Sequence, residues 1–333
     1  MKTDKTSRQI KGLGLCSGGL DSILSALILQ RQGIETTWIC FETPFFSSQS
    51  AQKAAHMTGI PLITMDITQD YMEMMKAPKA GFGKNMNPCM DCHALMFAKA
   101  GELLKEKGFD FLFSGEVLGQ RPKSQNKDSL RYVEKNSGFD GQILRPLCAR
   151  RLPETRMEQD GLVDREQLLD ITGRSRKVQM QLAKEFGIKE FPPPAGGCLL
   201  TDKNFSNRLR DLMVVQKKFE TRELFFLQSG RHFRLDDQTK IMVGRSLQDN
   251  ANLLKYTDPR TDIVIQPSSI AGPDTILTGN QTQNNIQTAA MICAGYTKAA
   301  PGEITDISVT QGGVTKVIRI KVVPADGFKH LMI

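Results

Sequence analysis

Tryptophan, histidine and long apolar runs are all scarce in this sequence. Its 333 residues include one tryptophan and four histidines, and aromatic residues make up 7% of the chain. The longest apolar runs, such as residues 23–29, fall well short of the ~20 residues that a membrane-spanning helix needs. The first ten residues lack the apolar stretch and cleavage site of a signal peptide. We therefore expect a cytoplasmic protein without a membrane partner.

Internal repeats and low-complexity tracts are also missing. An apolar fraction of 40% and a charged fraction of 24% exclude a disordered chain and a collagen-like fibre. At roughly 150 residues per domain, the length predicts about two domains. The seven cysteines should be reduced thiols, because no secretory signal precedes them. Four are isolated in the sequence, and most of these lie in apolar surroundings typical of small buried residues: Cys16, Cys40, Cys148 and Cys293.

The formal net charge is +8. Residues 121–189 and residues 203–245 each carry five more positive than negative side chains. Such an excess is compatible with a polyanionic partner, and equally with a solvated surface of mixed charge.

Strand-like and helix-like segments alternate along the first two-thirds of the chain. This alternation predicts an α/β domain over residues 1–203 with a doubly wound parallel sheet, which would bind ligands at the carboxyl ends of its strands. The strands are predicted over 11–16, 35–41, 61–67 and 109–114, and the helices over 21–32, 51–58, 90–107 and 165–186.

The pattern changes beyond about residue 204. Short strand-like segments surround one helical segment, which predicts a second, smaller α+β domain over residues 204–333. The strands are predicted over 240–243, 262–266, 307–310 and 315–323, and the helix over 281–294.

A serine- and glycine-rich turn, Ser17-Gly-Gly-Leu-Asp-Ser22, joins the first predicted strand to the first helix. Its glycines allow a tight turn whose N–H groups point at phosphate oxygens, and the helix N-terminus adds further donors. Ser17 and Ser22 offer hydroxyl groups. Asp21 is placed to bind a magnesium ion accompanying the phosphates, or is only an acidic residue at a helix N-terminus. No lysine follows the glycines, so the turn is not a G-x-x-x-x-G-K-[ST] loop.

This turn resembles the S-G-G-x-D-S loop of the N-type ATP pyrophosphatases. Those enzymes cleave ATP between the α- and β-phosphates and leave AMP on a substrate oxygen. The resemblance implies an adenine nucleotide alpha hydrolase-like fold, with ATP and Mg²⁺ as cofactors. It also implies that Ser17, Gly18, Gly19, Asp21 and Ser22 bind ATP.

Three further segments resemble the tRNA 4-thiouridine synthetases of that superfamily. The resemblance implies that Gly115, Gln120 and Arg145 bind ATP and that Glu116 is catalytic. Arg145 offers a planar donor for phosphate. Alternatively, Glu116 and Arg145 pair with each other, and Gln120 bonds only to backbone. The segments, in that family's order, are GEVLGQ (115–120), SQ (124–125) and LRPL (144–147).

Cys89 and Cys92 form a C-x-x-C pair before a predicted helix. Thiolating members of the superfamily carry such a pair, and Cys198 occupies the place of their distal cysteine. Three interpretations are open: a zinc site with the adjacent His93 as an awkward fourth ligand, thiol chemistry with a persulfide on Cys198, or a [4Fe-4S] cluster. We favour the cluster, because cluster-dependent tRNA thiolases have this arrangement. Cys89, Cys92 and Cys198 are therefore candidate catalytic residues and metal ligands.

The segment over residues 230–250 contains G-R-H-F-R-L and then V-G-R before a helix-like stretch. It resembles the start of the R domain of the NFACT family, which is associated with RNA. The resemblance implies RNA binding by one group of side chains, with phosphate contacts from the cations and stacking of the phenylalanine on an unpaired base. Alternatively, the segment is a hairpin with one solvated face and a ring in the core. The residues are Arg231, His232, Phe233, Arg234 and Arg245.

These resemblances imply an ATP-dependent tRNA sulfurtransferase that adenylates a tRNA uridine and replaces its oxygen with sulfur, forming 4-thiouridine. A sulfide or persulfide donor is expected, because nothing after residue 205 resembles a rhodanese domain. The alternatives are formation of 2-thiouridine or 2-thiocytidine, a non-thiolating ATP pyrophosphatase that makes amides, and an inactive scaffold that only binds RNA. The three cysteines argue against the amide ligase, and the intact phosphate loop argues against the scaffold.

Overall fold

The computed structural model describes residues 8–193 and 198–333. The chain divides into two compact units, Met1–Cys198 and Leu199–Ile333. Each unit contains its own β-sheet. None of the helices within the described residues combines the length and the apolarity that crossing a membrane requires.

The sheet of the N-terminal unit is parallel throughout. Its strand order is β3-β2-β1-β4-β5, and every neighbouring pair runs in the same direction. The order reverses direction between β1 and β4, so the crevice at their carboxyl ends is the expected ligand site of such a fold. The predicted doubly wound parallel sheet is confirmed. The strands are β1 (Lys11–Leu15), β2 (Glu35–Glu42), β3 (Leu62–Asp66), β4 (Phe111–Ser114) and β5 (Ile143–Leu144).

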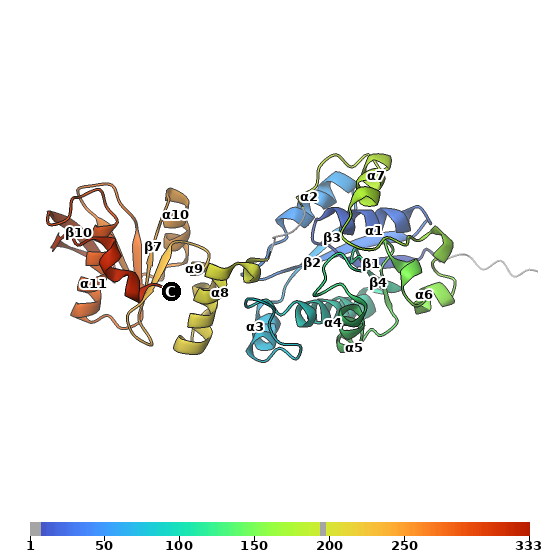
Figure 1. The fold of residues 1–333 in the computed structure, drawn as a ribbon, viewed down its shortest axis with the longest axis horizontal. Helices are drawn as coiled ribbons and strands as arrows, with labels where there is room; N and C mark the ends of the chain where they lie inside the picture. The colour runs from blue at the N-terminus through green and yellow to red at the C-terminus, as the bar shows by residue number, and fades with distance from the viewer. Residues whose placement is uncertain (1–7, 194–197) are drawn as a thin grey trace, which may run out of the picture. The chain divides into compact units, whose positions relative to one another are not determined.

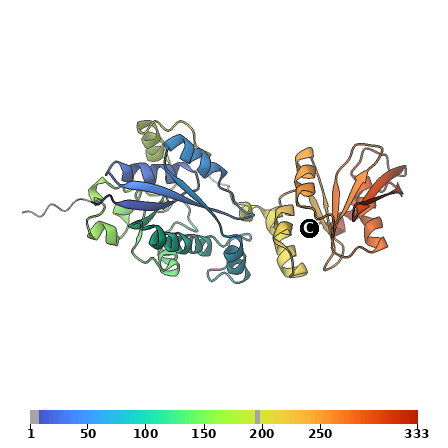
Figure 2. The same cartoon turned by 180° about the vertical axis from the view of Figure 1, so that it is seen from behind.

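Helices cover both faces of this sheet (Figure 1). Seen from in front and from behind, α1, α2 and α7 lie on one face, and α3, α4 and α5 lie on the other (Figure 2). The longer helices are α1 (Leu20–Gln30), α2 (Gln49–Thr58), α3 (Thr68–Lys76), α4 (Cys89–Lys107), α5 (Lys127–Ser137) and α7 (Lys177–Glu185). Shorter helical turns are η1 (Ala149–Arg151), α6 (Arg156–Gln159) and η2 (Arg165–Gln167).

The strands are hydrophobic because helices bury both of their faces. In β2, all six residues from Thr36 to Phe41 are buried, as expected for a central parallel strand. The core beneath α1 includes Leu24, Trp38 and Phe113, each fully shielded from solvent. Burial of this apolar surface, at ~25 cal/mol per Å², stabilises the layered arrangement.

The helix predicted over residues 165–186 is wrong for its middle part. Helical turns occur at η2 and at α7, and the residues between them are not helical. Gly173 has a φ of +82°, which ends helical geometry there. Leu168 and Ile171 are buried although they lie in a loop. Their i, i+3 spacing is that of a helix face, which explains the wrong prediction.

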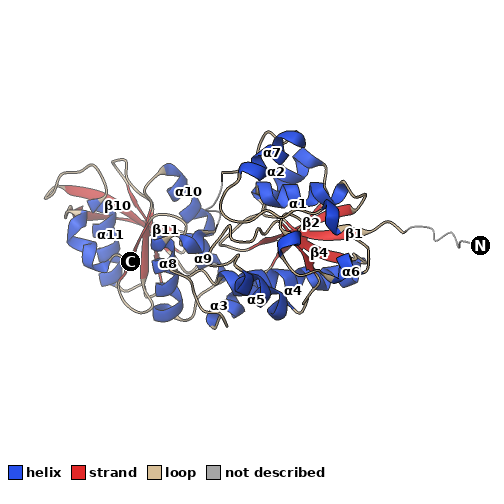
Figure 3. Ribbon diagram, turned by 45° about the vertical axis from the view of Figure 1, so that its right-hand side comes forward, coloured by secondary structure: helices blue, strands red, loops and turns tan. Residues whose placement is uncertain are grey.

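The sheet of the C-terminal unit is antiparallel (Figure 3). Its strand order is β11-β10-β8-β9-β7-β6. The predicted second α+β architecture is confirmed. The strands are β6 (Arg231–Arg234), β7 (Lys240–Val243), β8 (Ile263–Pro267), β9 (Thr275–Thr278), β10 (Ile304–Gln311) and β11 (Val314–Lys321).

Two hydrophobic clusters hold this second sheet between helices. One cluster joins the sheet to α11 and includes Phe233, Ile241 and Ile292. The other joins Met242 and Ile276 of the sheet to α9 and α10. The helical segments of the unit are η3 (Leu199–Thr201), α8 (Lys203–Arg210), η4 (Asp211–Gln216), α9 (Thr221–Phe226), α10 (Leu247–Tyr256), α11 (Gln283–Gly295) and η5 (Ala325–Leu331).

Candidate functional site

The predicted phosphate loop lies at the carboxyl end of β1 and leads into α1. Gly18 has a φ of +74°, and a Cβ at this position would lie 2.2 Å from the carbonyl carbon of Ser50. Both facts restrict the position to glycine. Gly19 caps α1 without a side-chain hydrogen bond, which leaves the first-turn N–H groups of α1 for an anion. Ser22 is buried, and its hydroxyl donates to the carbonyl of Gly19 at 2.8 Å.

The segment that follows β4 touches the first turn of α1. A Cβ on Gly115, just after β4, would lie 2.4 Å from the carbonyl carbon of Asp21. Gln120 reaches the same aspartate, because its Nε2 donates to Asp21 Oδ2 at 2.6 Å. The structure thus brings together three residues that were predicted to bind ATP from two separate motifs. Gln120 does not bond only to backbone.

Asp21 keeps one carboxylate oxygen without a protein partner. Its Oδ1 is buried, and no group within the described residues donates a hydrogen bond to it. Carboxylate oxygens are the ligands that Mg²⁺ prefers, and an unpartnered buried oxygen costs free energy unless a cation or donor reaches it. The geometry at Asp21 therefore fits the magnesium ion expected from the sequence.

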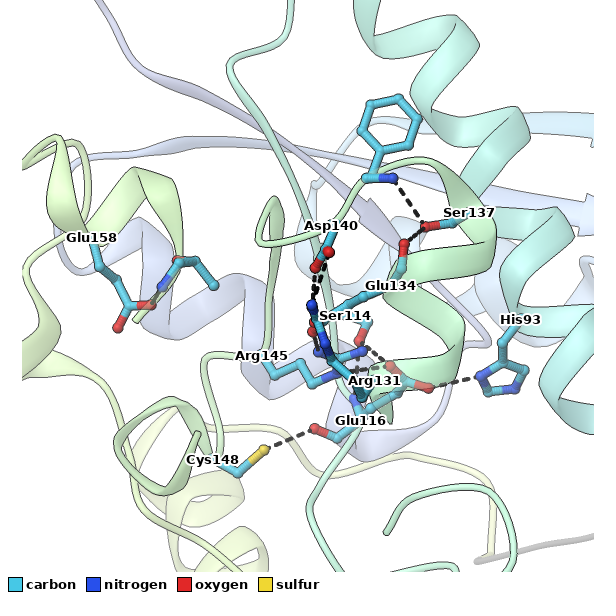
Figure 4. A network of polar contacts seen from close by, with 12 residues as sticks. His93, Ser114, Glu116, Arg131, Glu134, Ser137, Asp140, Arg145, Cys148 and Glu158 are labelled. Atoms are coloured by element: carbon cyan, nitrogen blue, oxygen red, sulfur yellow. Dashed lines mark hydrogen bonds and ion pairs between the residues drawn. The ribbon is translucent and has the colours of Figure 1, made fainter. Parts of the chain in front are cut away.

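Glu116 is the centre of a buried polar network at the end of β4 (Figure 4). Its Oε1 lies 2.7 Å from His93 Nδ1, and its Oε2 accepts from Arg145 Nε at 3.0 Å. Burial opposes ionisation of Glu116, but Arg145 and His93 outweigh it and hold its pKa at about 2. Because Glu116 is ionised, the His93 proton lies on Nδ1, and Nε2 faces away from this bond.

Arg145 is committed to this network rather than to an open surface. Its side chain is 1% exposed and forms ion pairs with Glu116 and Glu134. The structure favours the alternative in which Glu116 and Arg145 pair, and Arg145 has no exposed face for a phosphate in this structure. Its Nη2 is buried without a partner within the described residues, and ATP binding by Arg145 stays a prediction. Its position makes it a partner of Glu116.

The C-x-x-C pair occupies the first turn of α4. Asn87 Nδ2 donates to Cys89 Sγ at 3.3 Å, and the Tyr71 hydroxyl interacts with the Cys92 sulfur. Burial raises the pKa of the Cys92 thiol, the Tyr71 hydrogen bond lowers it, and the neighbouring Cys198 and Cys89 raise it further. Cys198 therefore lies close enough to the pair to act electrostatically on Cys92.

The three thiols do not form a metal cage in this structure. Among residues 8–193 and 198–333, no three His, Cys, Asp or Glu side chains gather closely enough to hold a metal ion. Cys89, Cys92 and Cys198 are all of intermediate exposure. Thiolates are nonetheless the natural ligands of an iron–sulfur cluster, so the chemistry of the donor set fits the group although the described geometry is not that of a closed site. The isolated Cys16, Cys40, Cys148 and Cys293 are all buried, which is one more than the three for which burial was expected.

Two of the predicted RNA-binding residues are in the core of the C-terminal unit. Phe233 has no exposed surface and packs in the α11 cluster, so the prediction that it stacks on a base is wrong. His232 is 1% exposed, and burial lowers its pKa well below the usual range. It is a neutral interior side chain, so the predicted phosphate contact is wrong for it as well.

The predicted arginines differ in how accessible they are. Arg234 is mostly buried and forms an ion pair with Asp211. Arg231 lies over the ring of Tyr296, with 4.5 Å from its guanidinium carbon to the ring centroid. Arg245 is half-exposed and pairs with Asp249 at 2.7 Å. Arg245 therefore retains exposed surface for a polyanion, Arg231 is of intermediate exposure, and Arg234 is mostly enclosed.

Three residues of the candidate site were missed or underused by the sequence analysis. His93 was considered only as an awkward zinc ligand, although its position after Cys92 places it beside the crevice. Tyr71 lies on α3, which the sequence analysis did not predict. Gln179 lies on α7 and bonds to Gln120, with 3.4 Å between its Nε2 and Oε1 of Gln120. Gln179 precedes Leu182 by three residues and Ala183 by four, so it lies on the buried face of α7. This spacing was the signal in the sequence that could have identified it.

Family models match both units. Residues 7–151 match the model described as thiamine biosynthesis protein (ThiI). The N-terminal unit is ThiI-like. Residues 230–332 match the model described as NFACT protein RNA binding domain. Both resemblances inferred from the motifs are confirmed.

Individual relatives of the ThiI-like unit are distant. A tRNA-specific 2-thiouridylase MnmA 2 from Thermoanaerobacter sp. (strain X514) is 24% identical over 221 residues, which cover 58% of this chain and 56% of the relative. A probable tRNA sulfurtransferase from Thermococcus kodakarensis is 25% identical over 193 residues, which cover 55% of this chain and 45% of the relative. The chain thus spans about half the length of the curated relatives that it matches.

A solved structure is also similar to part of the chain. It is described as a crystal structure of a 4-thiouridine synthetase–RNA complex with bound ATP. It is 21% identical, covers 41% of this chain and 36% of its own, and has a TM-score of 0.34.

Proposed function

We propose that this protein is an ATP-dependent tRNA sulfurtransferase that releases AMP and pyrophosphate. The observation that carries the proposal is the approach of three elements to one edge of a parallel sheet. A glycine-rich phosphate loop, the Asp21–Gln120 pair and the C-x-x-C turn all lie on segments of the ThiI-like unit. The names of the relatives, a tRNA sulfurtransferase and a tRNA 2-thiouridylase, support tRNA as the substrate.

The first half of the reaction uses the phosphate loop. The loop N–H groups and the N-terminus of α1 would bind the nucleotide phosphates, and the Asp21 carboxylate would hold the magnesium ion that neutralises their charge. A uridine oxygen of the tRNA attacks the α-phosphorus of ATP, the α–β bridging bond breaks, and pyrophosphate leaves. The oxygen is then bonded to AMP, which makes it a good leaving group.

The second half uses the thiols. Sulfide sulfur delivered at Cys89, Cys92 and Cys198 attacks the activated carbon, and AMP departs with the former uridine oxygen. The Asn87 hydrogen bond to Cys89 and the Tyr71 hydrogen bond to Cys92 stabilise negative charge on sulfur. We include in the proposal a [4Fe-4S] cluster held by the three cysteines, which would supply an open iron for binding inorganic sulfur.

The buried Glu116 network positions the residues that serve the two halves of the reaction. Glu116 connects His93, on the turn that carries Cys92, to Arg145 after β5. The salt bridge fixes the thiol-bearing turn relative to the strand ends. In this role Glu116 holds the site together and need not touch the substrate.

RNA binding is proposed for the C-terminal unit, because residues 230–332 match an RNA binding domain model. The candidate residues for phosphate contacts there are Arg245, which is half-exposed, and Arg231, which is of intermediate exposure. Contacts of this kind supply affinity without reading the sequence.

Nucleoside analysis tests the proposal. Purified protein, prepared without oxygen, is incubated with unmodified tRNA, ATP, Mg²⁺ and sulfide, and the tRNA is digested for mass spectrometry. We expect 4-thiouridine, and none without ATP or with Asp21→Ala. Formation of 2-thiouridine instead would support the alternative that the 2-thiouridylase relatives suggest. An absence of any thionucleoside, together with ATP turnover on an amine acceptor, would replace the proposal with an amide ligase.

A further inference from the structure

A fully buried glutamine extends the candidate nucleotide site onto α7. Gln179 has no exposed surface. It lies on the face of α7 that also buries Leu182 and Ala183, and α7 lies on the same face of the sheet as α1 (Figure 1). Full burial of a glutamine is uncommon, because its amide must find partners away from water.

The hydrogen bonds of Gln179 fix the direction of a short chain of amides. Asp21 Oδ2 can only accept, so Gln120 must present its Nε2 to Asp21. Gln120 Oε1 then faces Gln179, which donates from Nε2 at 3.4 Å. Each amide therefore has one orientation, and reversing either one would place two oxygens against each other.

Two oxygens at the ends of this chain are left without donors. Asp21 Oδ1 and Gln179 Oε1 are both buried, and neither has a hydrogen-bond partner within the described residues. Such atoms destabilise a fold that has no ligand. The oxygen of Asp21 lies at the phosphate loop, where a cation accompanying the nucleotide would reach it.

We propose that Gln179 is a positioning residue for the divalent cation of the nucleotide site. Through Gln120 it holds one oxygen of Asp21, so that the other oxygen is available to Mg²⁺. The proposal rests on the proposed ATP site and adds a residue that neither the motifs nor the family models assign. Gln179 acts on the cation through Gln120 and Asp21, and not by direct contact with it.

The test compares Gln179→Met with Gln181→Met. Methionine has nearly the shape of glutamine but cannot donate or accept in the chain. Gln181 lies on the same helix, is exposed, and bonds to Glu185, so it is the matched control. Calorimetry measures binding of an ATP analogue with a methylene group between its α- and β-phosphates, with and without Mg²⁺. Thermal unfolding is measured without nucleotide.

We expect Gln179→Met to weaken binding of the analogue about tenfold in the presence of Mg²⁺, and less than about twofold in its absence. A tenfold loss corresponds to ~1.4 kcal/mol. The Tm of the free protein should stay the same or rise, because a buried unpartnered acceptor has been removed. Gln181→Met should change neither quantity. A residue that serves only the packing of α7 would show the opposite pattern, a lower Tm with unchanged dependence on Mg²⁺.

Gln179→Leu provides a second variant if the methionine variant does not fold. It has no donor for Gln120 Oε1, so the same magnesium-specific loss is expected. Wild-type binding by either folded variant, or a loss of equal size with and without Mg²⁺, would overturn the inference. If the wild-type protein itself fails to bind the analogue, the proposed function fails. If the wild type binds and the Gln179 variants bind equally well, only the role of Gln179 is refuted.

Discussion

The predicted site residues of the two units lie in contrasting environments. In the ThiI-like unit, Asp21, Gly115 and Gln120 come together from two motifs that are about 100 residues apart. In the C-terminal unit, His232 and Phe233 of the predicted RNA-binding cluster are in the interior. The difference arises because the first set follows the carboxyl ends of parallel strands, which meet at one edge. The second set lies within a strand, where successive side chains alternate between faces.

Glycine-containing loops were therefore a better guide to the site than a cluster of cations and an aromatic residue. Gly18 has a positive φ and lies directly against the backbone of Ser50, so this position requires glycine. Arg231, His232, Phe233 and Arg234 restrict nothing by themselves, because each can serve a surface or a core. Substitutions in the two units should therefore have different effects on stability, on pH dependence and on RNA affinity.

The largest expected effect is on the stability of the ThiI-like unit. Glu116→Ala leaves the buried Arg145 with one fewer carboxylate and His93 without its partner. Removing one partner from a buried ion pair costs about 3–5 kcal/mol. Urea unfolding should be followed by the fluorescence of Trp38, the one tryptophan, which is buried in this unit. Glu106→Ala, at an exposed helical position, is the control, and equal stability of the two variants would refute the network's role.

The next effect falls on the C-terminal unit. Phe233→Ala empties a fully buried site in the α11 cluster and should lower the free energy of unfolding by about 3–5 kcal/mol. Hydrogen exchange resolved by peptide should show faster exchange in β6 and β7, with Trp38 fluorescence unchanged. Leu247→Ala removes an apolar side chain that is 88% exposed and should change little. A loss of RNA affinity without a loss of stability in Phe233→Ala would restore the stacking role rejected above.

The two units should also respond to opposite ends of the pH scale. Burial lowers the pKa of Lys240 to about 8, and the pairing with Asp211 offsets only part of this. Between pH 8 and 10.5 the unfolded chain holds more protons on this lysine than the folded chain does. The stability of the C-terminal unit should therefore rise over that range, by up to ~3 kcal/mol at 1.36 kcal/mol per pKa unit.

Lys240→Met should abolish this alkaline gain, as measured by urea unfolding at pH 8, 9 and 10. In the ThiI-like unit, Glu116 has its pKa depressed to about 2, so its contribution is present above its ordinary pKa and is lost as the pH falls toward 2. If the free energy of unfolding of the wild-type C-terminal unit does not change between pH 8 and 10, burial of Lys240 does not lower its pKa.

The smallest effect concerns RNA affinity. Arg231→Ala and Arg245→Ala should each weaken tRNA binding a few-fold and reduce its salt dependence by roughly one phosphate contact. Arg260, an 87% exposed arginine of the same unit, gives the matched control through Arg260→Ala. Titrations between 50 and 200 mM salt make the comparison. If all three variants lose affinity alike, binding is diffuse and the two predicted arginines have no special role.

The α/β sheet and the glycine-rich turn after its first strand could be predicted from the sequence, because both depend on local patterns. A buried strand, a glycine turn and an apolar helix follow one another within residues 11–30, and no distant contact is needed to recognise them. The pairing of Glu116 with Arg145 was considered as an alternative, and the structure favours it. The loop over 168–176 was mistaken for a helix because Leu168 and Ile171 are buried at helical spacing.

Other features could not be predicted because they depend on tertiary contacts. Gln179 joins the site only because α7 lies on the same face of the sheet as α1, which places it beside Gln120. The burial of His232 and Phe233 depends on which face of β6 meets α9 and α11. Period-2 alternation in a four-residue strand does not reveal which side is inside.

The most direct test of the proposed reaction measures the products of ATP and tRNA together. Unmodified tRNA, sulfide, Mg²⁺ and ATP labelled at the α-phosphate are mixed with the protein, and AMP, ADP and thionucleoside are counted in the same sample. We expect one AMP per thionucleoside, no ADP, and loss of both products in Asp21→Ala but not in Asp128→Ala, which changes an exposed acid in the first turn of α5. Formation of ADP, or of AMP at the same rate without tRNA, would contradict adenylation of the nucleic acid at this loop.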